Sequence, residues 1–317
     1  MTDRERSLGI FAVYGMFGAA LLAFGLLIHF GPDPEGPLVS GLSLLFVWAL
    51  AWRTNASLAR AGGRSAAIGC PLLFGLTLLA LWEMTVRLFD VPSVILPAPT
   101  AIAAAIAANL PTLWADFVQT VLKGALGGWV IGCAAGIATA LLVARSGFLR
   151  RGLLPVGNFV AALPIVGTAP ILVMWFGFGW ESKAAVVVVM VFFPVLVNTV
   201  AGLSDSEAMQ RDLMRTYGAT PGQTLRYLAL PSALPFVFNG LKIATTLALI
   251  GAIVAEFFGS PTIGMGFRIS TEVGRLNLPM VWASIFVAAI AGSASYALIS
   301  LLEKRLTFWH PSQRARG

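Results

Sequence analysis

Residues 184–203 read AAVVVVMVFFPVLVNTVAGL, twenty residues in a row without a charged side chain. A helix that crosses the roughly 30 Å hydrocarbon core of a membrane needs about 20 such residues, because each residue rises about 1.5 Å. The whole chain has this character, since 58% of its 317 residues are hydrophobic and only 11% are charged. Soluble domains have about 25% charged residues. The sequence therefore predicts an all-α, polytopic membrane protein.

Eight apolar runs are long enough, or nearly long enough, to cross the membrane. They are residues 8–30, 37–52, 66–82, 117–144, 155–177, 184–203, 237–258 and 279–303. The run at 8–30 is longer than the apolar core of a signal peptide, and we interpret it as a retained anchor.

The distribution of positive charge predicts the orientation of these spans. With a cytoplasmic N-terminus, 16 of the 21 Lys and Arg residues fall on the inner side. The outer side holds the other five, namely Arg87, Lys123, Lys183, Arg268 and Arg275. Because cytoplasmic loops are enriched in Lys and Arg, this bias predicts eight spans with both termini in the cytoplasm. The net charge of +7 then needs no nucleic-acid partner.

The chain has no recognisable catalytic or metal-binding pattern. Cys70 and Cys133 lie far apart within apolar runs, and His29 and His310 are isolated, so we expect neither a disulfide framework nor a metal site. None of the four lysines follows a glycine, which excludes a phosphate-binding P-loop. Neither G-x-S-x-G nor H-E-x-x-H occurs. We expect no catalytic residue, no metal and no bound cofactor in this chain.

The segment 204–236 is polar and lies on the inner side in this topology. Its first part, Ser204 to Tyr217, is predicted to be a helix capped by Ser204 or Ser206. Gly218 is predicted to end that helix in the left-handed conformation.

A second short helix is predicted from Pro221 to Tyr227, since proline is favoured in the first turn of a helix. Pro231 and Pro235 are predicted to end it and to lead the chain back to the membrane. The whole segment is therefore expected to be a rigid projection.

This segment resembles the EAA loop of type I ABC importer permeases, whose pattern is Glu-Ala-Ala, three residues, Gly, nine residues, Ile, one residue, Leu-Pro. Aligned on Gly218, the segment Asp212-Leu213-Met214 stands at the Glu-Ala-Ala positions, so that two residues replace the alanines. Gly218, Leu230 and Pro231 match outright, and Leu228 keeps an aliphatic side chain. The resemblance implies that the loop docks a separate ATPase. The contact residues it implies are Glu207, Arg211, Asp212, Leu213, Met214, Arg215, Gly218, Ala219, Leu228, Leu230 and Pro231.

Several other segments, between about residues 66 and 305, resemble the nitrate, sulfonate and taurine branch of this superfamily. They are Leu81-Trp82-Glu83, Leu96-Pro97-Ala98-Pro99-Thr100, Ala162-Leu163-Pro164, Trp175-Phe176-Gly177-Phe178-Gly179, Gly240-Leu241-Lys242, Ala255-Glu256 and Gly264-Met265-Gly266. The expected domains are an N-terminal extension with two spans (1–65), a six-helix permease core (66–310) containing the coupling loop, and a cytoplasmic tail (311–317).

The resemblance also implies partners and location. We expect a bacterial inner-membrane protein that pairs with a second permease copy, most simply as a homodimer. Two ATPase copies would use ATP and Mg²⁺, and an extracytoplasmic binding protein would deliver the solute. The branch transports small anions such as sulfonates, taurine, nitrate or bicarbonate, and also pyrimidine and aromatic compounds.

The translocation path is expected between residues 155–203 and 237–258. Its candidate residues are Pro164, Thr168, Met174, Asn198 and Glu256, with hydrogen bonding between helices as the alternative role for the polar ones.

Charged residues within the apolar runs lie near their ends. Glu83, Lys123, Lys242 and Glu256 could all reach the lipid headgroups. The lack of a charge near mid-membrane weighs against the second hypothesis, a carrier driven by an ion gradient. A membrane anchor or scaffold is the third.

Overall fold

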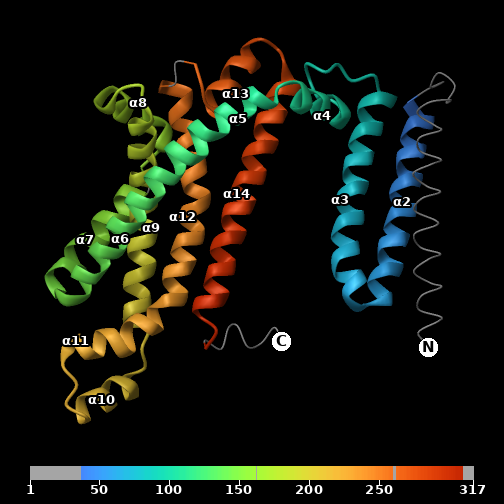
Figure 1. Ribbon diagram of the computed structural model, residues 1–317. Coiled ribbons are helices and arrows are strands. Elements are labelled where there is room, and N and C mark those ends of the chain that lie inside the picture. The colour runs from blue at the N-terminus through green and yellow to red at the C-terminus, as the bar shows by residue number, and fades with distance from the viewer. Residues whose placement is uncertain (1–36, 162, 260–261, 310–317) are drawn as a thin grey trace. The chain divides into compact units, whose positions relative to one another are not determined.

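The computed structural model describes residues 37–161, 163–259 and 262–309, and the predicted span at 8–30 lies outside them (Figure 1). Every regular element in these ranges is helical, as the sequence predicts. The elements are α2 (Pro37–Ala61), α3 (Gly63–Leu88), α4 (Pro99–Ala108), α5 (Leu110–Phe117), the π-helical η1 (Val118–Ala125), α6 (Leu126–Arg145), α7 (Gly147–Ala161), α8 (Ile165–Phe176), α9 (Trp180–Ser204), α10 (Ala208–Thr216), α11 (Pro221–Thr224), the π-helical η2 (Leu225–Ala229), α12 (Leu230–Gly259), α13 (Met265–Gly274) and α14 (Leu278–Leu306).

Within the described residues, five helical stretches are long and apolar enough to cross a membrane. They are Ala66–Leu88, Leu110–Arg145, Trp180–Ser204, Pro221–Gly259 and Leu278–Leu306. Each contains one of the predicted apolar runs.

The predicted span at 155–177 is wrong as a single helix. The chain there forms two shorter helices, α7 and α8, which are separated before Pro164. Pro164 disfavours helical geometry at the residue before it and has no N–H to donate, so a helix cannot run straight through this point. Pro164 itself is extended (ψ 112°) and directly precedes α8.

The chain divides into two compact units, of which the first contains the described residues up to Ala108 together with Leu276–Trp282. In it α2 and α3 pack against each other through Leu58, Ala66 and Leu73. Glu83, near the end of α3, accepts hydrogen bonds from Arg87 Nε (2.6 Å) and from Thr100 Oγ1 at the start of α4 (2.7 Å). The prediction that Glu83 reaches the lipid headgroups is therefore wrong, because its carboxylate is held within the protein.

The second unit contains Asn109–Arg275 and the residues from Ala283 onward, and α9 lies at its centre between α6 and α12. Glycines allow α6 to approach α9 closely. A Cβ at Gly128 would lie 2.5 Å from Cβ of Val187, and one at Gly132 would lie 2.4 Å from Cγ2 of Val191. The four-residue spacing puts both glycines on one face of α6, and small residues on such a face let two helix backbones approach closely in a membrane.

Helical structure is continuous from Pro221 through η2 to the end of α12, so the prediction that Pro231 and Pro235 end a helix is wrong. Pro231 is the second residue of α12 and lies two positions after the last residue of the π-helical η2. Proline disrupts an α-helix because it lacks the N–H that bonds four residues back and its ring clashes with that carbonyl. The wider π-helical turns displace this bonding pattern just ahead of Pro231.

Candidate functional site

The polar segment after α9 folds into the short helices α10 and α11 (Figure 1). The prediction that α10 starts at Ser204 is wrong, since α9 continues through Ser204, whose Oγ donates to the Val200 carbonyl (3.0 Å). The cap is Glu207, which forms a reciprocal capping box with Gln210, and its N–H donates to Gln210 Oε1 (3.2 Å). The helix therefore starts after Glu207 and not after either serine, because the side chains of Glu207 and Gln210 each bond a free N–H at the start of the helix.

Gly218 ends α10 with φ +68°, as the sequence predicts. Its N–H donates to the Arg215 carbonyl (2.9 Å), and the N–H of Ala219 donates to the Met214 carbonyl (2.9 Å). Two bonds back into the last turn fix the direction in which the chain leaves the helix. The second helix begins at Pro221 as predicted, with Thr220 as its cap.

One face of α10 carries an exposed apolar stripe. None of the helix residues is buried, and Met209, Leu213 and Tyr217 are 79%, 56% and 81% exposed. These positions are four residues apart, so their side chains lie along the same side of the helix. We call these three residues the α10 stripe.

The charged side chains of α10 have partners within the segment. Arg211 donates to the carbonyls of Ser204 and Ser206, while Arg215 lies 3.4 Å from Asp212 in a solvent-exposed ion pair. Arg211 therefore fixes α10 to the end of α9, and the exposed pair adds little to stability.

The remaining predicted contact residues occupy different surroundings. Met214, Ala219, Leu228 and Pro231 are half-buried, whereas Leu230 is exposed. Of the two residues that replace the pattern's alanines, Leu213 thus faces outward and Met214 is turned partly toward the protein.

The predicted path residues do not gather at one place. Asn198 donates to the Pro194 carbonyl (2.8 Å) and accepts from Asn239 Nδ2 on α12 (3.0 Å), which is the alternative role, a bond between helices. Thr168 Oγ1 donates to the carbonyl of Ile165 in its own helix (3.3 Å). Pro164 and Met174 are exposed, at the start and near the end of α8.

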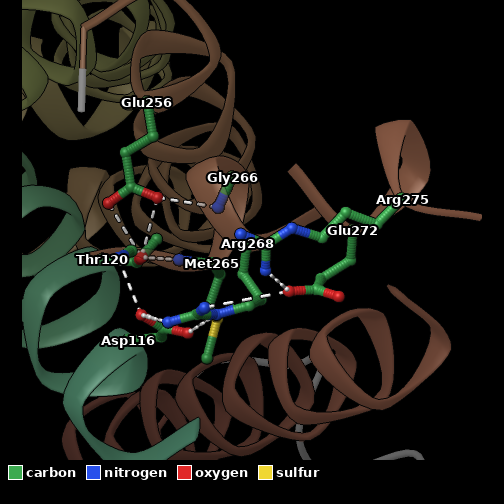
Figure 2. Close-up of polar contacts among 9 residues, drawn as sticks. Asp116, Thr120, Glu256, Met265, Gly266, Arg268, Glu272 and Arg275 are labelled. Carbon is green, nitrogen blue, oxygen red and sulfur yellow. Dashed lines mark hydrogen bonds and ion pairs between the residues drawn. The ribbon is translucent and has the colours of Figure 1, made fainter. Parts of the chain in front are cut away.

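Glu256 is buried, at the end of α12 remote from α10, where it contacts Thr120 (Figure 2). Thr120 Oγ1 lies 2.8 and 2.9 Å from the two carboxylate oxygens and donates to them. Both residues also accept N–H groups from the start of α13. Met265 N donates to Thr120 Oγ1 and Gly266 N to Glu256 Oε2, both at 2.8 Å. The prediction that Glu256 reaches the headgroups is wrong, since it is 1% exposed.

Asp116 extends this network along α5. Its Oδ1 accepts from Gly264 N (2.8 Å) and its Oδ2 from Arg268 Nε (2.8 Å). Three successive N–H groups at the start of α13 are thereby satisfied, and two carboxylates lie where the helix dipole favours negative charge. We call Asp116, Thr120 and Glu256 the α13 clamp.

Two contacts surround the clamp. A Cβ at Gly266 would lie 2.2 Å from the carbonyl oxygen of Ile253, so only glycine lets α13 rest this closely on α12. Glu272 lies 3.1 Å from Arg275 and 4.0 Å from Arg268, which links the clamp to the far end of α13 (Figure 2).

Lys183, at the start of α9, is also buried and donates to the carbonyls of Phe178 and Gly259. Lys242, predicted to reach the headgroups, instead pairs with Glu303 on α14 (2.8 Å). That prediction is wrong because both partners are largely enclosed by the protein.

Sequence reasoning did not single out Asp116, Thr120 or Arg268. One signal was present, since Asp116 and Thr120 are four residues apart and share a helix face. Their partners stand 136 to 152 positions away, which no local pattern shows.

Comparison with known proteins gives a consistent result. Residues 132–308 match the family described as binding-protein-dependent transport system inner membrane component. The formylaminopyrimidine transport permease protein of Halalkalibacterium halodurans is 33% identical over 77% of this chain and 96% of its own length. The riboflavin transport system permease protein of Chloroflexus aurantiacus is 32% identical over 78% of this chain and 91% of its own. The taurine transport system permease protein of Escherichia coli is 28% identical over 63% of this chain and 72% of its own.

These similarities favour an ATP-driven importer over the ion-gradient carrier, because the similar proteins are permease components of import systems. The chain belongs to the family of binding-protein-dependent transport system inner membrane components, and it is a multi-pass membrane permease of the ABC importer type.

Proposed function

We propose that the chain forms the translocation path of a type I ABC importer and that residues 204–236 couple it to a separate ATP-hydrolysing subunit. The observation that supports this most is the α10 stripe. It puts three apolar side chains on a short helix that is capped at both ends and fixed to α9 by Arg211. Exposed apolar groups in a rigid, polar surrounding are typical of a protein–protein contact. The stripe is the surface that seats on the ATPase.

The test is copurification of the ATPase with variants of α10. Leu213→Asp places a charge in the centre of the stripe, and we expect it to weaken association at least about tenfold, as for the central residues of an interface. Arg215→Ala truncates the opposite face of α10. Arg215 is also among the contact residues that the resemblance implies, but if the stripe carries the docking energy this variant should stay within about fivefold of wild type, because charges at the rim of an interface contribute little to affinity. Equal association of wild type and Leu213→Asp would exclude the stripe as the docking surface.

The proposed topology has eight spans with both termini in the cytoplasm, and the span at 155–177 is made by α7 and α8 together. In it, residues 1–65 form an extension with two spans, residues 66–310 form the permease core and residues 311–317 form a cytoplasmic tail. The positive-charge bias supports this arrangement. Single cysteines placed at Tyr217 and at Arg275, in a chain with Cys70 and Cys133 replaced, test it. An impermeant thiol reagent outside the cell should label position 275 and leave position 217 unlabelled.

The proposed assembly has two copies of this chain, two ATPase subunits that bind ATP and Mg²⁺, and an extracytoplasmic binding protein. One coupling segment per chain and two ATPase sites per importer support a homodimer. The mass of the purified complex tests this stoichiometry. The solute is a small molecule of the kinds named for the related permeases, which include formylaminopyrimidine, riboflavin, taurine and bicarbonate.

A further inference from the structure

A hollow of about 320 Å³ lies beside the α13 clamp, in the second unit of the chain. Its walls include four phenylalanines and two hydroxyl side chains, which are Phe178, Phe257, Phe258, Phe267, Ser270 and Thr271. Ligand sites in proteins have about 300–1,000 Å³, so the hollow fits a small molecule.

The lining chemistry distinguishes between the solute classes named for the related permeases. Glu256 is the one ionisable group among the described residues that line the hollow, and it is acidic. Its carboxylate already accepts hydrogen bonds from Thr120 and Gly266. A neighbouring cation, Lys183, is buried and already donates to the carbonyls of Phe178 and Gly259, so the described lining offers an anion no cationic side chain. An uncharged flat ring would meet phenyl faces, on which it can stack.

The α13 clamp determines the shape of this hollow. Phe267, Ser270 and Thr271 all belong to α13, and the residue before Phe267 is bonded to Glu256 through its N–H group. Glu256, which lines one side of the hollow, therefore holds in place α13, the helix that lines another side. Such a site is already shaped before a ligand arrives, which lowers the entropy lost on binding.

We propose that this hollow is a binding subsite for a flat, uncharged aromatic heterocycle, and that the imported solute is of this class and not an oxyanion. The inference rests on the proposed function, because the hollow meets a solute only in a chain that forms a translocation path. The two relatives with more than 30% identity that carry a named solute, formylaminopyrimidine and riboflavin, agree with the lining chemistry.

The first experiment measures ATP-driven uptake into proteoliposomes that contain the permease, its ATPase and its binding protein. The probes are formylaminopyrimidine and riboflavin, with taurine and bicarbonate as the anions. We expect uptake of an aromatic probe and none of either anion. Loss of an aromatic side chain that stacks on a nucleic-acid base costs about 1–3 kcal/mol, or about 5- to 150-fold in affinity. Phe267→Ala should accordingly raise the half-saturating concentration about tenfold or more.

Two variants control for damage to the fold. Phe267→Tyr keeps the ring and should stay within about twofold of wild type. Phe286→Ala removes an exposed ring from α14, outside the hollow, and should not change uptake. Copurification of the ATPase with each variant shows that the complex is assembled.

A second measurement isolates the permease from its binding protein. Riboflavin fluorescence is titrated with the permease–ATPase complex in lipid nanodiscs, where quenching by wild type and its loss in Phe267→Ala are expected. Equal quenching or equal uptake by wild type and Phe267→Ala would overturn the subsite. Import of taurine or bicarbonate with no aromatic uptake would overturn the solute class while the importer function stands. An absence of both ATPase copurification and ATP-driven uptake would refute the proposed function itself.

Discussion

Replacing Thr120 with valine tests whether the α13 clamp holds the structure together. Valine keeps the shape of threonine but removes the hydroxyl that donates to Glu256 and accepts from Met265 N. Glu256 and Met265 are 1% and 0% exposed, so water cannot replace the lost partner without local opening. Glu256 keeps its bond from Gly266, whereas Met265 N loses the one acceptor described for it.

The expected cost follows from these contacts. A buried polar group left without a partner costs about 1–3 kcal/mol. Hydrogen bonds between membrane helices have averaged about 0.6 kcal/mol, with a maximum near 1.7 kcal/mol. The unpaired N–H of Met265 and the lost bond between Thr120 and Glu256 together predict a decrease of about 2–4 kcal/mol in the free energy of unfolding.

The assay is reversible unfolding of the purified chain in mixed micelles titrated with a denaturing detergent. Thr245→Val is the matched control, since Thr245 is also buried but its hydroxyl donates only to the carbonyl of Leu241 in its own helix (2.8 Å). This control should cost less than about 1 kcal/mol. If Thr120→Val were no more destabilising than Thr245→Val, the clamp would not stabilise the fold.

Three further changes test other parts of the structure. Gly218→Pro, at a φ of +68° that proline cannot adopt, should abolish ATPase stimulation by solute in the assembled complex, and normal stimulation would refute the coupling role. Gly132→Ala places a Cβ 2.4 Å from a side-chain atom and should destabilise the chain by about 1–3 kcal/mol, whereas Gly75→Ala meets nothing within 4 Å and should be neutral in thermal denaturation. Lys242→Met leaves the carboxylate of Glu303 enclosed without its partner and should cost about 3–5 kcal/mol, and the double change with Glu303→Gln should recover most of that loss in the same unfolding assay.

Features that depend on neighbouring residues could be predicted from the sequence. The spans follow from the lengths of apolar runs, and the turn at Gly218 follows from a glycine after a short amphipathic helix. The close contact at Gly128 and Gly132 could be predicted because the four-residue spacing puts both glycines on one helix face.

Two predictions about helix ends were wrong because other local interactions decide where the helices begin and end. Ser204 and Ser206 are good caps, but the Glu207–Gln210 pair satisfies two N–H groups at once. Pro231 was predicted to end a helix because proline disrupts a regular α-helix. The π-helical turns that precede it cannot be recognised from the spacing of hydrophobic residues.

The α13 clamp could not be predicted because the bonds of Asp116 and Thr120 join residues more than 100 positions apart. Glu256 and Gly264 lie in segments that resemble the family, but nothing in the sequence pairs either of them with Asp116. Only the packing of η1, α12 and α13 brings their charges and N–H groups together. The hollow beside them depends on the same packing, so its lining could not be predicted either.

The continuous helix from Pro221 to Gly259 joins the segment that carries α10 to the α13 clamp. Its 39 residues span about 58 Å at about 1.5 Å per residue, so a tilt of about 5° around its middle shifts each end by about 2.5 Å. That shift would part Glu256 from Thr120 if only α12 moved. If the clamp stays closed, η1 and α13 must move together with α12, and a tilt of α12 then also moves the α13 wall of the aromatic hollow.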